Sequence, residues 1–144
     1  MKITKNGKDF KNYTNEDGAI NIKENGVILD CGSYSIINCG SDSIINCGSY
    51  SIINCDSDNT INCNSVNTIN CYFNNTIKSR GERNVVIRRD FFEIIELKKG
   101  QTIRLNGWGI KGYKIIEDKD KEVEKAIKLL ENKGIIKNGK IIIN

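Results

Sequence analysis

The 144-residue sequence contains no histidine and no proline. Histidine is the side chain most often used for proton transfer near neutral pH, and its neutral imidazole is the commonest metal ligand. The sequence also lacks a GxSxG nucleophile motif and a P-loop, and no dinucleotide-binding unit is expected. We therefore predict no catalytic residue and no cofactor, and we expect that the protein is not an enzyme.

Long apolar runs are absent as well. No stretch of about 18 apolar residues could cross a bilayer. The first ten residues, Met1 to Phe10, are polar and charged and lack the apolar core of a signal peptide. We expect no membrane contact and a cytoplasmic location. In a reducing cytosol the six cysteines are expected to be thiols.

The sequence does contain a cysteine at every eighth position, and each cysteine begins an octad. The first octad is CGSYSIIN and the last is CYFNNTIK. A short fixed period is typical of solenoids, in which each unit buries its apolar side by stacking on the next. The octads resemble those of short-coil β-solenoid proteins in general, and no single family is indicated. The cysteines are Cys31, Cys39, Cys47, Cys55, Cys63 and Cys71.

Side-chain parity assigns the two faces of each octad. Counted from the cysteine as position 1, position 7 is always isoleucine, and position 3 is serine until Phe73. Because side chains alternate along a strand, we expect positions 7, 1 and 3 to point inward. Positions 2, 4, 6 and 8 are then external, with asparagine ladders at position 8.

The coil length follows from position 4, which alternates between tyrosine and aspartate at Tyr34, Asp42, Tyr50 and Asp58. This alternation favours a coil of about sixteen residues with two strands and two bends. A three-sided coil of 24 residues is the alternative. In the sixteen-residue coil the cysteines form two columns, Cys31–Cys47–Cys63 and Cys39–Cys55–Cys71.

The predicted fold is mainly β and has three parts. Residues 1–22 form an N-terminal cap with a hairpin at Asn6-Gly7, and residues 23–88 form the β-solenoid around an octad core at 31–78. Residues 89–144 form a small α+β C-terminal domain. Its strands are expected at 91–97, 102–105 and 110–117, and a terminal β-hairpin turns at Asn138-Gly139. Between them the apolar spacing predicts a helix over 119–133, capped by Asp118 and Gly134.

The cysteine spacing argues against a metal site. Zinc and iron–sulfur sites use clustered short spacings such as CxxC, often with histidine. A uniform spacing of eight produces columns of thiols instead, and a free cysteine packs as a small hydrophobe. We therefore predict structural thiols and no metal, and disulfides are the alternative.

The arginines are the most selective polar signal outside the octads, since all five fall within 25 residues. Residues 79–144 carry sixteen basic and ten acidic side chains, a net charge of +6. Arginine forks suit carboxylates and phosphates, so this segment is a candidate partner-binding or phosphate-binding region. The alternative is internal ion pairing with Glu82, Asp90, Glu93 and Glu96. The candidates are Arg80, Arg83, Arg88, Arg89, Arg104, Lys137 and Lys140.

Four external aromatic residues are candidate anchors for a protein interface: Tyr34, Tyr50, Tyr72 and Trp108. On this basis we predict a non-enzymatic protein–protein interaction module with a rigid solenoid body. A phage or mobile-element inhibitor that docks on a host complex is the class we expect. Nucleic-acid binding by the basic segment is the alternative, followed by a carbohydrate-binding or structural rod. A homodimer through the C-terminal domain is expected, formed by the helix or by strands within 91–117.

Overall fold

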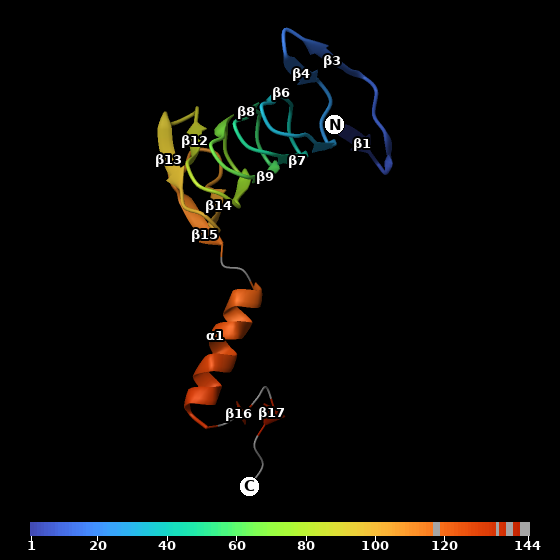
Figure 1. The fold of residues 1–144 in the computed structure, drawn as a ribbon. Helices are drawn as coiled ribbons and strands as arrows, with labels where there is room; N and C mark the ends of the chain where they lie inside the picture. The colour runs from blue at the N-terminus through green and yellow to red at the C-terminus, as the bar shows by residue number, and fades with distance from the viewer. Residues whose placement is uncertain (117–118, 135, 138–139, 142–144) are drawn as a thin grey trace.

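The computed structural model describes residues 1–116, 119–134, 136–137 and 140–141. It shows a two-sided β-solenoid followed by one helix (Figure 1). The predicted mainly β class, the coil of about sixteen residues and the single C-terminal helix are confirmed.

Two sheets form the walls of the solenoid. In spatial order, the first sheet contains β15 (Tyr113–Ile116), β14 (Thr102–Leu105), β11 (Thr76–Ser79), β9 (Thr60–Cys63), β7 (Ile44–Cys47), β5 (Ile28–Asp30), β1 (Lys2–Lys5) and β2 (Lys8–Asp9). The second contains β13 (Glu93–Leu97), β12 (Asn84–Arg88), β10 (Thr68–Cys71), β8 (Ile52–Asn54), β6 (Ile36–Asn38), β4 (Ala19–Ile22) and β3 (Tyr13–Glu16).

The register of the parallel strands fixes the coil length. Ile36 pairs with Ile52 in the second sheet, and Ile44 pairs with Thr60 in the first. Both steps are sixteen residues, so each coil consists of two octads on opposite walls. The 24-residue alternative would need a third wall, and the two sheets leave no place for one.

Antiparallel strands close the parallel stack at both ends. At the N-terminal end β1 pairs with β5 and β3 pairs with β4, and the predicted Asn6-Gly7 turn joins β1 to β2 with φ of 52° and 76°. The parallel stack begins at β4, within the residues expected to form the cap. At the other end β13 pairs with β12 and β14 pairs with β11. These terminal strands shield the solenoid edges, which would otherwise recruit other chains.

The strands expected in a C-terminal domain therefore extend the solenoid itself, because β13, β14 and β15 join the two sheets. Beyond them lies α1 (Lys119–Asn132), which ends at Gly134 with φ of 73°. The strands β16 (Ile136–Lys137) and β17 (Lys140–Ile141) pair antiparallel after it. Asp118 and the Asn138-Gly139 turn lie outside the described residues. No helix in the described part of the chain is long and apolar enough to span a bilayer.

The core is a thin column of isoleucine and cysteine. Every position-7 isoleucine is fully buried, as are Cys63 and Cys71. Cys47 pairs with Cys63 across adjacent strands, as expected for the cysteine columns, and all six cysteines are free thiols. Cys31 and Cys39, nearest the N-terminal end, are only half-buried.

Two of the buried thiols, Cys47 and Cys55, are poor nucleophiles. The pKa of Cys55 is raised by its hydrogen bonds with Cys39 and Cys71 and then by burial. The pKa of Cys47 is raised by its hydrogen bond with Cys63 and by burial. Because the thiolate is the reactive form, these raised pKa values keep both side chains protonated and unreactive near neutral pH. These two cysteines therefore serve packing.

The inward assignment of position 3 needs correction. The position-3 serines are exposed or half-buried, whereas the position-5 side chains Ser43, Ser51, Asn59, Asn67 and Asn75 are at most 2% exposed. The strands end at the cysteine or at the asparagine before it, so alternation stops there. The left-handed residue at position 4 then turns the chain, and position 5 points into the solenoid.

These buried side chains form a hydrogen-bonded ladder, which we call the position-5 ladder. The Ser51 N–H donates to Asn67 Oδ1 at 2.8 Å, and the Asn59 N–H donates to Asn75 Oδ1 at 2.9 Å. Each asparagine amide also donates back to a bend carbonyl, as Asn67 Nδ2 does to Gly48 O at 3.0 Å. The ladder satisfies backbone groups that the bends would leave unpaired, a requirement for burying them.

Replacing a position-5 asparagine should destabilise the fold more than replacing an external one. Asn67→Ala removes the acceptor of the buried Ser51 N–H, so we expect a loss of about 2–3 kcal/mol. The matched control is Asn62→Ala, since Asn62 donates to Asn46 Oδ1 at 2.8 Å in the half-buried external ladder. Its loss should be below about 1 kcal/mol. Urea unfolding measures both values, and equal losses would contradict the role of the position-5 ladder.

Candidate functional site

One corner of the solenoid carries a column of large side chains. Tyr34, Tyr50, Val66 and Arg83 occupy corresponding positions in successive coils, and all have left-handed φ between 57° and 61°. Hydrogen bonds between coils hold them, from the Tyr34 N–H to Ser49 O at 2.9 Å and from the Tyr50 N–H to Ser65 O at 3.1 Å. We call these four residues the tyrosine column.

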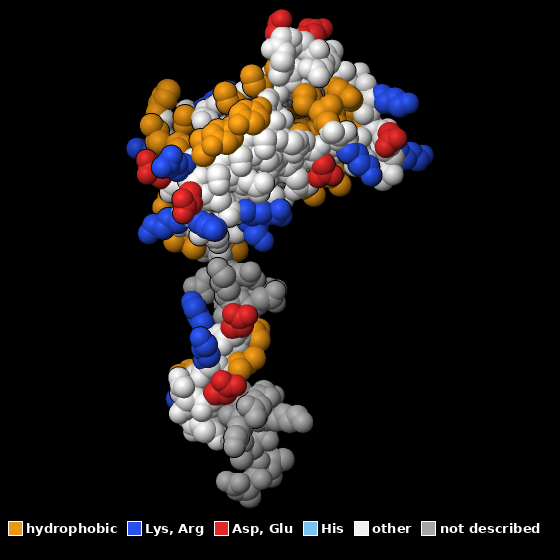
Figure 2. All heavy atoms as spheres, viewed as in Figure 1, with side chains coloured by type: hydrophobic (Ala, Val, Ile, Leu, Met, Phe, Trp, Pro, Cys, Tyr) orange, Lys and Arg blue, Asp and Glu red, His pale blue; other side chains and the backbone are white. Residues whose placement is uncertain are grey.

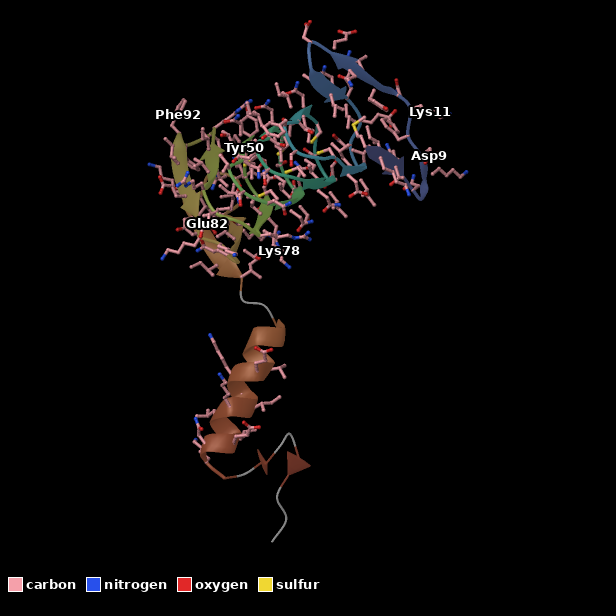
Figure 3. The ribbon with its side chains drawn as sticks, viewed as in Figure 1. Asp9, Lys11, Tyr50, Lys78, Glu82 and Phe92 are labelled. Carbon is pink, nitrogen blue, oxygen red and sulfur yellow. The ribbon has the colours of Figure 1, made fainter. Side chains whose placement is uncertain are left out.

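The two tyrosines of this column form an exposed, ordered surface. Their ring centroids are 5.1 Å apart with an interplanar angle of 5°, and the residues are 78% and 55% exposed. Ile36 and Ile52, two residues further along the chain in the second sheet, are 37% and 42% exposed. Figure 2 shows hydrophobic side chains gathered along one edge of the solenoid, and Figure 3 marks Tyr50 on it. Tyr34, Tyr50 and Val66 of the tyrosine column therefore form one apolar strip with these isoleucines, and Arg83 lies at its end.

The opposite corner of the solenoid shows that the fold does not require large side chains at position 4. Asp42, Asp58 and Asn74 hold the same octad position with φ of 57° to 61°. Aspartate and asparagine tolerate the left-handed region, whereas a bulky or β-branched side chain in it is an outlier. The tyrosine column therefore retains strained residues at positions where the same fold accepts tolerant ones. Strain of this kind clusters at functional surfaces.

Arg88, one of the candidate binding residues, lies in the interior. It is fully buried and forms a bidentate ion pair with Asp90, with Nε to Oδ1 at 2.8 Å and Nη2 to Oδ2 at 2.9 Å. It also donates to the carbonyls of Gly107 at 3.0 Å and Ile110 at 2.6 Å. The guanidinium lies 4.8 Å from the centroid of the Phe91 ring. Arg88 therefore fastens the loop before β15 and is unavailable to a partner.

The structure does not gather the remaining arginines into one rim. Arg83 ends the tyrosine column. Arg89 follows β12 in a turn, and its side chain donates to Asn54 Oδ1 on β8 at 3.1 Å. Arg80 follows β11 at a bend, and Arg104 is exposed on β14. The side chains of Lys137 and Lys140 lie outside the described residues.

Arg104 instead belongs to a basic face of the first sheet that the sequence did not reveal. It pairs directly with Lys114 on β15 and with Thr76 on β11. Lys78, two residues along β11, is also exposed on this sheet (Figure 3). We call Lys78, Arg104 and Lys114 the basic face. Lys114 could not be identified from sequence, because only the antiparallel return of β14 and β15 brings it beside Arg104.

The other two aromatic candidates lie apart from the tyrosine column. Trp108 is 75% exposed and packs edge-to-face on Phe73, with centroids 5.5 Å apart and an interplanar angle of 77°. Tyr72 is half-buried. The sequence grouped four aromatic residues as candidates, and the structure stacks only Tyr34 and Tyr50. The candidates did not include Ile36 and Ile52. Both occupy position 6 of their octads, and the expected external location of position 6 could have identified them.

Residues 107–112, GWGIKG, match the Gly-x-Gly-x-x-Gly spacing of dinucleotide-binding loops. Those loops join a strand to a helix, whose N-terminus binds the pyrophosphate. Here the loop joins the antiparallel strands β14 and β15, so no helix follows it. The match does not indicate a dinucleotide site. Among the described residues no group of three or more His, Cys, Asp or Glu side chains could hold a metal ion.

Comparisons with protein-family models, with curated proteins and with solved structures find no match to this chain. The surfaces described above therefore carry the functional argument.

Substitution at Val66 tests the strain in the tyrosine column. Val66→Asn places a residue that tolerates φ of 59° at this position, so we expect the free energy of unfolding to rise by about 1 kcal/mol. The reverse change at the opposite corner, Asp58→Val, should lower it by a similar amount, about 1 kcal/mol. Urea unfolding of both variants and the wild type measures the change in the free energy of unfolding, which should be positive for Val66→Asn and negative for Asp58→Val. A destabilised Val66→Asn variant would contradict strain at this corner.

Proposed function

We propose that the protein is a non-enzymatic protein–protein interaction module that binds its partner through the tyrosine column and the adjacent Ile36 and Ile52. The observation that carries this proposal is the retention of Tyr34 and Tyr50 in a left-handed conformation that aspartate occupies at the other corner. Aromatic side chains that are exposed yet ordered are favoured anchors of protein interfaces.

The rigidity of the surface supports binding. Each tyrosine is held by an inter-coil backbone hydrogen bond, and the two rings stack on one another. Ordering flexible side chains is one of the main costs of association, and a surface that is already ordered avoids most of it. The solenoid therefore supplies a preorganised platform.

The class of partner that we propose is a host protein complex, which the module would inhibit as a product of a phage or mobile element. The support for this part is the combination of a small rigid body, an apolar strip and no catalytic constellation among the residues described above. Fold alone does not imply function, so the partner must be captured directly.

Nucleic-acid binding by the basic C-terminal segment is the second candidate. Lys78, Arg104 and Lys114 gather on one face of the first sheet, and phosphate contacts by lysine and arginine dominate such binding. Figure 2 shows several basic side chains at this end of the solenoid. Binding of this type would weaken steeply with salt.

Self-association is part of the same proposal. The edge strand β15 has all four residues exposed, including Ile115 at 62%, and α1 exposes Val123 at 56% and Leu129 at 54%. A second copy of this chain would cover these apolar groups. We therefore expect a dimeric mass by light scattering, and a monomer at micromolar concentration would contradict it.

Capture of the partner from a host lysate tests the primary function. The double variant Tyr34→Ser/Tyr50→Ser removes both stacked rings and should lose the captured protein, because aromatic anchors carry much of the binding energy. The matched control is Trp108→Ser, which removes an exposed aromatic side chain that lies apart from the tyrosine column and outside β15 and α1.

A nuclease arm separates the two candidate functions. Capture that survives nuclease and requires Tyr34 and Tyr50 supports the interaction module. Capture that disappears with nuclease, together with a steep salt dependence, would replace it with nucleic-acid binding. Equal capture by the double variant and the wild type would rule out the tyrosine column as the contact surface.

A further inference from the structure

We propose that Arg104 and Lys114 form the two cationic walls of a binding site for a single phosphate or sulfate group. They line a cavity of about 330 Å³ at the C-terminal end of the first sheet. The site is independent of the tyrosine column. The lining residues are Asn74, Arg104, Leu105, Asn106, Gly107 and Lys114.

The charge arrangement points to an anion. Arg104 and Lys114 are direct cross-strand partners on β14 and β15, so their Cβ atoms lie about 5 Å apart. Like charges directly opposite each other destabilise a sheet. Neither side chain forms an ion pair with any described residue, and the lining residues that the structure describes include no acid. An oxyanion between the two would replace repulsion with two attractive contacts.

The remaining lining supplies neutral polar groups. Asn74 presents its carboxamide close to Gly107, where an added Cβ would lie 3.4 Å from Asn74 Oδ1. The glycine thus leaves space at the cavity wall. The Asn74 N–H donates to Asn106 O at 3.2 Å, which ties the solenoid corner to the loop. Amide groups beside an arginine fork provide the donors that tetrahedral oxyanions require.

Hydrogen bonds hold the cavity wall in place. Arg88 donates to Gly107 O at 3.0 Å, and the Asn106 side chain donates to Lys111 O at 2.8 Å. The Asn106 N–H also donates to Gly112 O at 3.0 Å. The loop that carries Asn106 and Gly107 is therefore fixed before any ligand arrives. This gives Arg88 a positioning role for the site.

The size of the cavity selects the class of ligand. Pockets for small molecules usually measure about 300–1,000 Å³, and this one lies at the lower end of that range. It accommodates one phosphate or sulfate group and a small attached moiety, rather than successive nucleotides of a strand. Inorganic phosphate and sulfate share the required tetrahedral oxyanion, and both serve as probes.

The test is thermal unfolding of the full chain in rising phosphate, with sodium chloride adjusted to constant ionic strength, and a parallel series in sulfate. A ligand at ten times its dissociation constant raises the folded-to-unfolded ratio about elevenfold. We expect a saturable rise in the midpoint for the wild type. Arg104→Gln and Lys114→Gln should each abolish the saturable part. Arg104→Lys should retain some of it, because the charge remains without the fork.

Lys78→Gln is the matched control, since it removes an exposed cation from the same sheet outside the cavity lining. It should keep the saturable response. Phosphate and sulfate also stabilise proteins generally by exclusion from their surfaces, but that effect does not saturate and is common to all variants. A response without saturation, or an equal loss in Lys78→Gln and Arg104→Gln, would overturn the site. Saturation with sulfate but not phosphate would assign it to sulfated ligands.

The side chains of Lys78, Arg104 and Lys114 are exposed, so we expect every variant to fold. Circular dichroism of each variant without ligand checks this. Loss of phosphate binding leaves the partner-capture experiment unaffected, because Arg104 lies on the first sheet beside Asn74, at the corner opposite the one that carries Tyr50. The two proposals therefore fail independently.

Discussion

The hydrogen bonds from the position-5 backbone N–H groups of residues 35, 43, 51, 59 and 67 to a side-chain oxygen in the next coil are the interactions on which this solenoid depends. A coil of sixteen residues encloses little apolar volume, and its bends place backbone donors in that interior. Ser43 and Asn59 show the arrangement, in which the serine N–H donates to the asparagine Oδ1 at 2.9 Å. Without such acceptors the bends would bury unpaired polar groups. The isoleucine and cysteine columns can then stack around a satisfied polar spine.

Once the bends are fixed, the two corners become equivalent in backbone and free to differ in side chain. One corner carries Asp42, Asp58 and Asn74, which suit a left-handed residue, and the other carries Tyr34, Tyr50 and Val66. The cost of the bulky residues is tolerated because inter-coil bonding over-determines the backbone. The fold requires a left-handed backbone at each corner but does not fix the external side chain there. The corner with Tyr34, Tyr50 and Val66 can therefore carry an exposed apolar surface.

The C-terminal end uses a different device. Arg88, buried with Asp90 and under the loop carbonyls of Gly107 and Ile110, joins the last parallel strand to the antiparallel strands that close the stack. A buried arginine is tolerated only when its donors are satisfied. The carbonyls of Gly107 and Ile110 accept from Arg88, and these bonds fix the shape of their loop. That shape creates the cavity beside Arg104.

The period of eight and the parity of isoleucine and cysteine by themselves predicted the solenoid, and the Tyr/Asp alternation favoured a sixteen-residue coil with two walls over a three-sided coil of 24 residues. The strand register then decided for sixteen. Local patterns also predicted the Asn6-Gly7 turn, β14 and the helix, because short-range preferences decide such elements. Tertiary structure alone decided that position 5 rather than position 3 is buried, since the bend interrupts strand alternation. It also decided that Arg88 faces inward while Arg104 meets Lys114. Those placements depend on which strands return antiparallel, and antiparallel pairings of this kind leave no periodic trace in the sequence.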